Sequence, residues 1–227
     1  MKVLSIDIGI KHLAHCLFDV TDTIKIIDWD VIDLTDECKC ACSKPATHQL
    51  HQTYYCKKHI HDKTLCQLIS LCTEHKLPLG TMVEMKKTLK RETKPIQFTL
   101  IDIGVQIMKR YTRFEHVDVV LIENQIGPLA SKMKAIQGMV LQYWLMRNAK
   151  VECISSVNKL KLFHKGKTTY SQRKKLSIQF TSQLLILNDM DVSMFNAHKK
   201  KDDLADTFLQ AVWYFNNNCG LLKINCS

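Results

Sequence analysis

The chain has 227 residues, a length typical of one domain with room for a small inserted module. Apolar residues make up 46% of it, and glycine and proline are scarce, which excludes a collagen-like or low-complexity chain and predicts a sizeable core. The formal net charge of +10 favours a polyanionic partner, most often nucleic acid, although a basic surface that only maintains solubility would have the same composition.

Two further features bear on the compartment. The first apolar stretch is interrupted at Asp7 and does not resemble a signal peptide, and no apolar run reaches membrane-spanning length. We therefore expect a soluble, intracellular protein. In a reducing compartment its ten cysteines are expected to be thiols or metal ligands, not disulfides.

The chain begins with three predicted strands. Residues 3–8, 12–20 and 24–32 are rich in β-branched and apolar side chains and are separated by short turns. Because the connections are so short, we expect an antiparallel meander.

Cysteine and histidine crowd residues 36–60, where the apolar periodicity disappears. Two pairs of ligand residues are separated by a short gap, as in small zinc-binding modules. This pattern predicts a structural zinc site, because thiolate and imidazole ligands complete a tetrahedron around Zn²⁺. The preferred ligands are Cys38, Cys42, Cys56 and His59, and Cys40 is an alternative to Cys38. Free thiols in a loop are the competing interpretation, but the segment has too few apolar residues to fold without help. Three spare donors are present: His48, His51 and His61.

The rest of the chain alternates predicted helices and strands. Helical spacing of apolar residues is found at 61–77, 96–111, 129–147, 171–187 and 202–215. The run at 117–122 predicts a strand buried on both faces, and a shorter strand is expected at 151–155. Ser171 is the expected cap of the fourth helix.

This order predicts an α/β fold with a mixed sheet flanked by helices. We expect one domain built from residues 1–33 and 95–227, interrupted by an inserted zinc-binding module and a charged connector at 34–94.

Carboxylates interrupt the apolar pattern at separate places in the chain. Asp7 lies within an apolar strand and Glu123 closes another, positions where a carboxylate is costly unless it is paired or binds a metal. On the last helix Asp203 and Asp206 are three residues apart and project together. Asp202 and Asp206 would also face one another, although we expect Asp202 to be a solvated residue of the helix amino terminus. Together Asp7, Glu123, Asp203 and Asp206 predict a Mg²⁺ site, because Mg²⁺ prefers oxygen ligands.

Basic residues dominate the segment before the last helix. Those expected to contact DNA phosphates are Lys159, Lys161, Lys165, Lys167, Arg173 and Lys175. Phe163 and Tyr170 lie among them and offer rings on which unpaired bases could stack.

Three motifs carry a specific resemblance: Leu4-Ser5-Ile6-Asp7-Ile8-Gly9, Leu121-Ile122-Glu123-Asn124-Gln125 and Lys200-Lys201-Asp202-Asp203-Leu204-Ala205-Asp206. They resemble the acidic motifs of RuvC-type Holliday junction resolvases, most closely those of the poxvirus branch in large DNA viruses. The resemblance covers residues 1–33 and 95–216 and implies an RNase H-like fold, a homodimer and Mg²⁺, with Mn²⁺ as a possible substitute. It also implies that the protein acts at sites of viral DNA replication in the host cytoplasm or nucleus. Small resolvases of the poxvirus type lack the Cys/His insertion.

The resemblance assigns roles to individual residues. Its acidic ligands correspond to Asp7, Glu123, Asp203 and Asp206. Its active-site lysine corresponds to Lys174, three residues after the expected cap, or to Lys175. A second, DNA-contacting lysine corresponds to Lys159 or Lys161.

The leading hypothesis is a Mg²⁺-dependent endodeoxyribonuclease that cuts four-way DNA junctions symmetrically and leaves 5′-phosphate ends. One alternative is an RNase H-like nuclease that acts on flaps or RNA–DNA hybrids. Another is a zinc-containing DNA-binding protein without catalytic activity. The carboxylate at Asp7 argues against the last, because a binding protein gains nothing from a buried acid on a central strand.

Overall fold

The computed structural model describes the chain except residues 35–38, 51–52, 76–93, 96–97, 126–130 and 221–227. It divides into two compact units, one of Met1–Leu34 with Leu100–Ser227 and one of Thr35–Thr99. The second boundary, expected at 94/95, therefore lies after Thr99. The reason is that β6 (Lys94–Pro95) pairs with β4 (His48–Leu50) inside the insertion.

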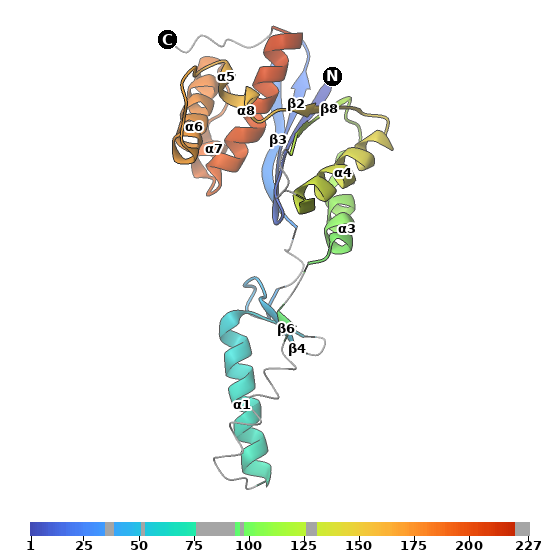
Figure 1. The fold of residues 1–227 in the computed structure, drawn as a ribbon, viewed down its shortest axis with the longest axis vertical. Helices are drawn as coiled ribbons and strands as arrows, with labels where there is room; N and C mark the ends of the chain where they lie inside the picture. The colour runs from blue at the N-terminus through green and yellow to red at the C-terminus, as the bar shows by residue number, and fades with distance from the viewer. Residues whose placement is uncertain (35–38, 51–52, 76–93, 96–97, 126–130, 221–227) are drawn as a thin grey trace. The chain divides into compact units, whose positions relative to one another are not determined.

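The first unit is built on a five-stranded mixed sheet (Figure 1). Three strands form the predicted antiparallel meander: β1 (Lys2–Ile8), β2 (His12–Val20) and β3 (Ile24–Asp33). Two more run parallel to β1, namely β7 (Val119–Glu123) and β8 (Lys150–Ile154). The order β3-β2-β1-β7-β8 places the two strands that carry Asp7 and Glu123 side by side at the centre.

Helices cover both faces of this sheet (Figure 1). On one face α8 (Lys201–Asn218) packs across β1, β2, β3 and β7, with α5 (Asn158–Lys161), α6 (Tyr170–Leu187) and α7 (Ser193–Ala197) beside it. On the other, α4 (Ser131–Leu145) contacts β1, β7 and β8, and α3 (Leu100–Tyr111) packs on α4.

The main core lies between α8 and the sheet. Phe208 and Phe215 of α8 contact Phe18 of β2, and Trp29 stacks on Phe195 at 5.2 Å between ring centroids. The Trp29 indole also donates a hydrogen bond to the Leu204 carbonyl at 3.2 Å. This packing fixes the start of α8, and therefore its aspartates, relative to the strands.

Two predicted helix starts are wrong. The cap of α6 is Thr169, not Ser171, and its hydroxyl and the Gln172 side chain form a reciprocal capping box. The helix expected from residue 96 begins at Leu100, because the chain first pairs as β6.

The second unit consists of a small antiparallel sheet, β5-β4-β6, and the helix α1 (Lys57–His75), where a helix at 61–77 was predicted. Its β5 (Thr53–Tyr55) leads directly into Cys56 and α1. Of the charged connector predicted at 84–94, all but Lys94 lies outside the described residues. None of the helices in the described part of the chain is both long and apolar enough to span a membrane.

Candidate metal centre and basic cleft

Asp7 and Glu123 meet at the carboxyl ends of the two central strands. In the parallel pairing of β1 with β7, Ile6 is opposite Ile122, so each acid lies one residue beyond a matched pair. Val3, Ser5 and Asp7 share one face of β1 because side chains alternate along a strand. That face is the one covered by α8, since Gln210 of α8 contacts Ser5.

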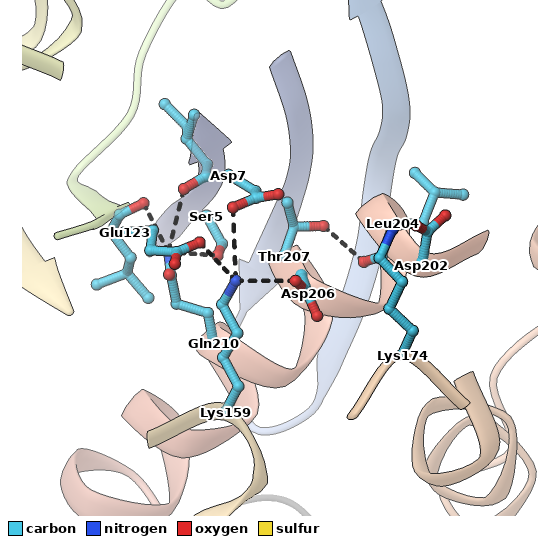
Figure 2. A network of polar contacts seen from close by, with 12 residues as sticks. Ser5, Asp7, Glu123, Lys159, Lys174, Asp202, Leu204, Asp206, Thr207 and Gln210 are labelled. Atoms are coloured by element: carbon cyan, nitrogen blue, oxygen red, sulfur yellow. Dashed lines mark hydrogen bonds and ion pairs between the residues drawn. The ribbon is translucent and has the colours of Figure 1, made fainter. Parts of the chain in front are cut away.

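Asp206 reaches the same place from the first turns of α8. We call Asp7, Glu123 and Asp206 the inner acidic cluster. Their carboxylates surround the Lys159 ammonium, which lies 2.7 Å from Glu123 Oε2, 3.2 Å from Asp206 Oδ2 and 3.4 Å from Asp7 Oδ1 (Figure 2). Lys159 is only 5% exposed, so this cation is enclosed by the cluster.

The pKa values in the inner acidic cluster are shifted because negative charges lie close together in a site with little access to water. Burial raises the pKa of the Asp7 carboxyl to about 7, against the lowering effect of Lys159. Burial also raises the pKa of Asp206. Burial opposes ionisation of Glu123 as well, but hydrogen bonds with Asp7 and Lys159 lower its pKa overall. Lys159 therefore offsets part of the negative charge of the cluster, and burial favours the protonated form of Asp7.

The other aspartates of α8 have different partners. Asp203 accepts a contact from the Lys200 ammonium at 3.1 Å, and Asp202 is paired with Lys174. The Lys174 ammonium also lies 5.1 Å from the centre of the Tyr170 ring. The hydrogen bond to Asp202 raises the pKa of Lys174, which keeps this side chain charged.

All four predicted carboxylates line one cavity of about 980 Å³. Its wall also carries Lys159, Lys174 and Asp202, and four of the residues predicted to contact DNA: Lys161, Lys165, Lys167 and Arg173. Lys175 is exposed but does not line it. The structure therefore joins the predicted acidic and basic groups in a single cleft. Of the two lysines, Lys159 contacts Asp7, Glu123 and Asp206, whereas Lys174 is paired with Asp202.

The residues of the inner acidic cluster fit divalent metal ions. They offer only carboxylate oxygens, the donors that Mg²⁺ and Mn²⁺ prefer. They also already gather around a cation, the Lys159 ammonium, which stands in for part of the positive charge that a metal would bring.

Gln210 ties the three elements that carry these acids together, a role that the sequence analysis did not assign. It lies one turn after Asp206, and its side-chain amide donates hydrogen bonds to Ser5 Oγ at 3.1 Å, the Ile6 carbonyl at 3.3 Å and the Leu121 carbonyl at 3.1 Å (Figure 2). Gln210 is fully buried. A glutamine among the apolar residues of the last helix was the signal that could have revealed it.

Replacing Gln210 with methionine should lower the free energy of unfolding by ~1–3 kcal/mol, because three buried acceptors lose their shared donor. Urea denaturation measures this change. Gln183→Met, at an exposed position of α6, is the matched control and should have an effect within ±0.5 kcal/mol. Equal effects of the two substitutions would contradict the anchoring role of Gln210.

A second group of potential ligands lies in the inserted unit. The ligand atoms of Cys40, Cys42, Cys56 and His59 all lie within 4.8 Å of one another. Cys40 Sγ is 3.1 Å from His59 Nδ1, and Cys42 Sγ is 3.8 Å from Cys56 Sγ. The structure thus brings together the alternative set that begins with Cys40, whereas Cys38, the preferred choice, lies outside the described residues. Two spare donors, His48 and His61, are not part of the group, and His51 also lies outside the described residues.

Local backbone structure explains this convergence. The Ser43 amide donates to the Cys40 carbonyl at 2.8 Å, and the Cys40 amide donates to the Lys44 carbonyl at 3.0 Å, which forms a tight turn. Cys56 and His59 lie at the start of α1, three residues apart and therefore on one side of the helix. Hydrogen bonds from the amides of Cys42 and Cys56, and one with His59, lower the pKa of the Cys40 thiol to about 6, which favours the thiolate form that binds metals.

Two solved structures resemble the whole chain. A fowlpox virus resolvase in complex with its substrate Holliday junction DNA is 19% identical, with 96% of this chain and 98% of that chain covered and a TM-score of 0.56. A second crystal structure, of the fowlpox virus Holliday junction resolvase, is 18% identical, with 96% of this chain and 99% of that chain covered and a TM-score of 0.54. These likenesses confirm the RNase H-like fold.

Sequence comparisons agree with this result. The uncharacterized protein L451 of Acanthamoeba polyphaga mimivirus is 24% identical over 94% of this chain and 74% of its own length. The model of the Poxvirus A22 protein family matches residues 74–218, more than half of the chain. The matched range includes Glu123, Lys159, Asp203 and Asp206 and leaves Asp7 outside. As its motifs predicted, the chain belongs to the Poxvirus A22 protein family.

Proposed function

We propose that this protein is a Holliday junction resolvase, a metal-dependent endonuclease that hydrolyses phosphodiester bonds in four-way DNA junctions. The observation that carries the proposal is the convergence of Asp7, Glu123 and Asp206 on one cation in a cleft whose walls are basic. Family membership and the fold shared with the fowlpox virus resolvase support the choice of substrate.

The chain's own residues divide the work. Asp7, Glu123, Asp206 and Asp203 would hold the ions, and the strands and the helix that carry them keep the carboxylates in place. When bound, divalent ions would stabilise the attacking oxygen of water and the leaving oxygen of the phosphodiester, and would generate a nucleophile from water near neutral pH. Lys174 and Arg173 border the same cleft, where their charge favours a phosphate at the reacting position. The products carry 5′-phosphate and 3′-hydroxyl ends.

Two strands must be cut in a four-way junction, so paired cleavage needs two active sites. We therefore include a homodimer in the proposal, with one cleft on each subunit. Sedimentation at working concentration should give a mass of two chains, and symmetric nicks should arrive in pairs.

Exposed lysines at the cleft should supply affinity without reading sequence. Replacing Lys165 and Lys167 together with alanine should weaken junction binding and reduce the slope of log Kd against log salt by ~2, about one for each lost phosphate contact. Lys25→Ala is the matched control, since Lys25 lies at the opposite end of the sheet. If the slope of log Kd against log salt is unchanged in the double variant, the DNA does not bind at these two lysines.

A substrate comparison tests the function directly. Labelled four-way junction, flap and RNA–DNA hybrid should be incubated separately with Mg²⁺, with Mn²⁺ and with a chelator. The proposal predicts metal-dependent, symmetric nicks in the junction at rates well above those on the other two substrates. Preference for a flap or hybrid would indicate a different RNase H-like nuclease. Binding without cutting in either metal would indicate a non-catalytic DNA-binding protein.

The group of Cys40, Cys42, Cys56 and His59 is proposed to hold a structural Zn²⁺. Three thiolates and one imidazole form a closed tetrahedral set, the arrangement that structural zinc sites use. Such an ion would stabilise this small unit, because metal binding supplies folding free energy.

Metal analysis of purified variants tests the zinc assignment. The wild type should contain ~1 Zn per chain, since four ligands form one closed site. Cys40→Ser and Cys42→Ser should lose it. Cys66→Ser removes an exposed thiol of α1 and should retain it. Cys38→Ser separates the two candidate ligand sets: retention of zinc supports Cys40, and loss of zinc supports Cys38.

A further inference from the structure

The position of Lys159 points to a function beyond that of a DNA contact. Its ammonium contacts all three members of the inner acidic cluster, at 2.7, 3.2 and 3.4 Å, while only 6% of its side chain is exposed. A lysine that contacted DNA from the surface would extend toward solvent, as the exposed Lys161, Lys165 and Lys167 do. Lys159 instead occupies the space between carboxylates that the proposed function assigns to metal ions.

The fold sets this position. Lys159 lies on the short helix α5, which follows β8 directly and packs against α8 and α6. The neighbouring Leu160 packs against the core, which holds α5 in place while the side chain of Lys159 points into the cluster. The cluster is therefore built around a cation that belongs to the chain itself.

Charge balance favours this arrangement and places Lys159 in competition with metal ions. One ammonium offsets one of three carboxylates that would otherwise repel each other across a desolvated site. A divalent ion bound to the same oxygens would lie within a few ångström of the ammonium, and like charges at that range repel strongly. The ammonium and the ion therefore compete for these ligands.

We propose that Lys159 is an internal counter-ion that holds the metal-binding carboxylates together in the metal-free protein and is displaced from them when divalent ions bind. The inference rests on the proposed function, because it takes the inner acidic cluster as the metal site. The cleft beside Lys159 gives its flexible four-carbon stem room to turn. In that position the displaced ammonium faces the phosphates of bound DNA, so DNA should favour metal loading.

Metal affinity without any substrate tests this exchange. Calorimetric titration with Mn²⁺ should compare the wild type, Lys159→Met, Lys25→Met and Asp7→Asn. Removal of the competing ammonium should make Lys159→Met bind Mn²⁺ at least ~10-fold more tightly. Lys25→Met is the control, because it removes an exposed ammonium at the opposite end of the sheet from the inner acidic cluster and should bind like the wild type.

A second measurement covers the case in which Lys159→Met folds poorly without metal. A ligand that binds only the folded state raises Tm by an amount that increases with the logarithm of its affinity, so Mn²⁺ should raise Tm more in Lys159→Met than in the wild type. Lys159→Arg retains the charge and should show no such increase. Equal or weaker Mn²⁺ binding by Lys159→Met would overturn the exchange while leaving the metal site intact. Absence of binding by the wild type, or binding unaffected by Asp7→Asn, would overturn the proposed function and this inference with it.

Discussion

Asp7→Asn should reduce the single-turnover rate of junction cleavage at least ~10³-fold, because a misplaced metal forfeits several kcal/mol of transition-state stabilisation. Asparagine keeps the shape of the side chain but loses the charge that a divalent ion requires. Junction affinity should stay within about threefold, since phosphate contacts by the basic residues dominate binding. Gel-based cleavage and fluorescence anisotropy on the same labelled junction measure the two quantities.

Asp19→Asn is the control for this substitution. Asp19 lies in the same sheet but opposite Lys2, at the far end of β1 from Asp7. It should leave both rate and affinity unchanged. If Asp7→Asn still cleaves the junction, the carboxylate of Asp7 has no part in the mechanism. If the variant loses both cleavage and junction binding, the substitution damages the fold.

Asp206→Asn should lower cleavage at least ~10²-fold, whereas Asp202→Asn should change it by less than about threefold. The two residues are one helical turn apart on α8, yet Asp206 contacts the Lys159 ammonium in the inner acidic cluster and Asp202 is paired with Lys174 outside it. Asp203 lines the same cavity and should behave like Asp206. Single-turnover rates at saturating Mg²⁺ separate these effects from metal affinity.

Comparing neighbours on one helix also controls for structure. Asp202, Asp203 and Asp206 are all partly exposed, so none of the three asparagine substitutions should affect folding strongly. If Asp202→Asn loses most of its activity while Asp203→Asn stays normal, then Asp202, not Asp203, belongs to the metal-binding face of α8.

The acidic positions could be predicted from sequence because they violate a local rule. Asp7 and Glu123 interrupt apolar strands, where an unpaired carboxylate is costly, so they could be identified as candidate metal ligands without a structure. Parallel strand ends lie at one edge of a sheet, which also predicted that the two would meet. The structure adds that α8 crosses that edge with Asp206 toward them.

The lysines could not be assigned in the same way. A lysine side chain is long and flexible, so its ammonium can lie several ångström from the position that the backbone suggests. The prediction for Lys174 also depended on a cap at Ser171, whereas Thr169 begins the helix through its reciprocal bonds with Gln172. The depth of Lys159 depends on how α5 packs beneath the cleft, which no local pattern records.

The ligands of the inserted unit show a similar limit. Spacing alone allowed either Cys38 or Cys40 to join Cys42, because both lie within reach of a short turn. The structure brings Cys40 to His59 through the turn that ends at Lys44. Tertiary placement of that turn beside His59, which the number of intervening residues does not determine, makes Cys40 a candidate ligand.

The most direct test of the account is the location of divalent metal in a crystal of this protein soaked with Mn²⁺, read from anomalous scattering. We predict a peak coordinated by oxygens of Asp7, Glu123 and Asp206, with the Lys159 ammonium moved away from them. A map in which Mn²⁺ binds elsewhere while Lys159 still contacts all three carboxylates would contradict the account, because the acids would then be a structural ion-pair network and not a catalytic metal site.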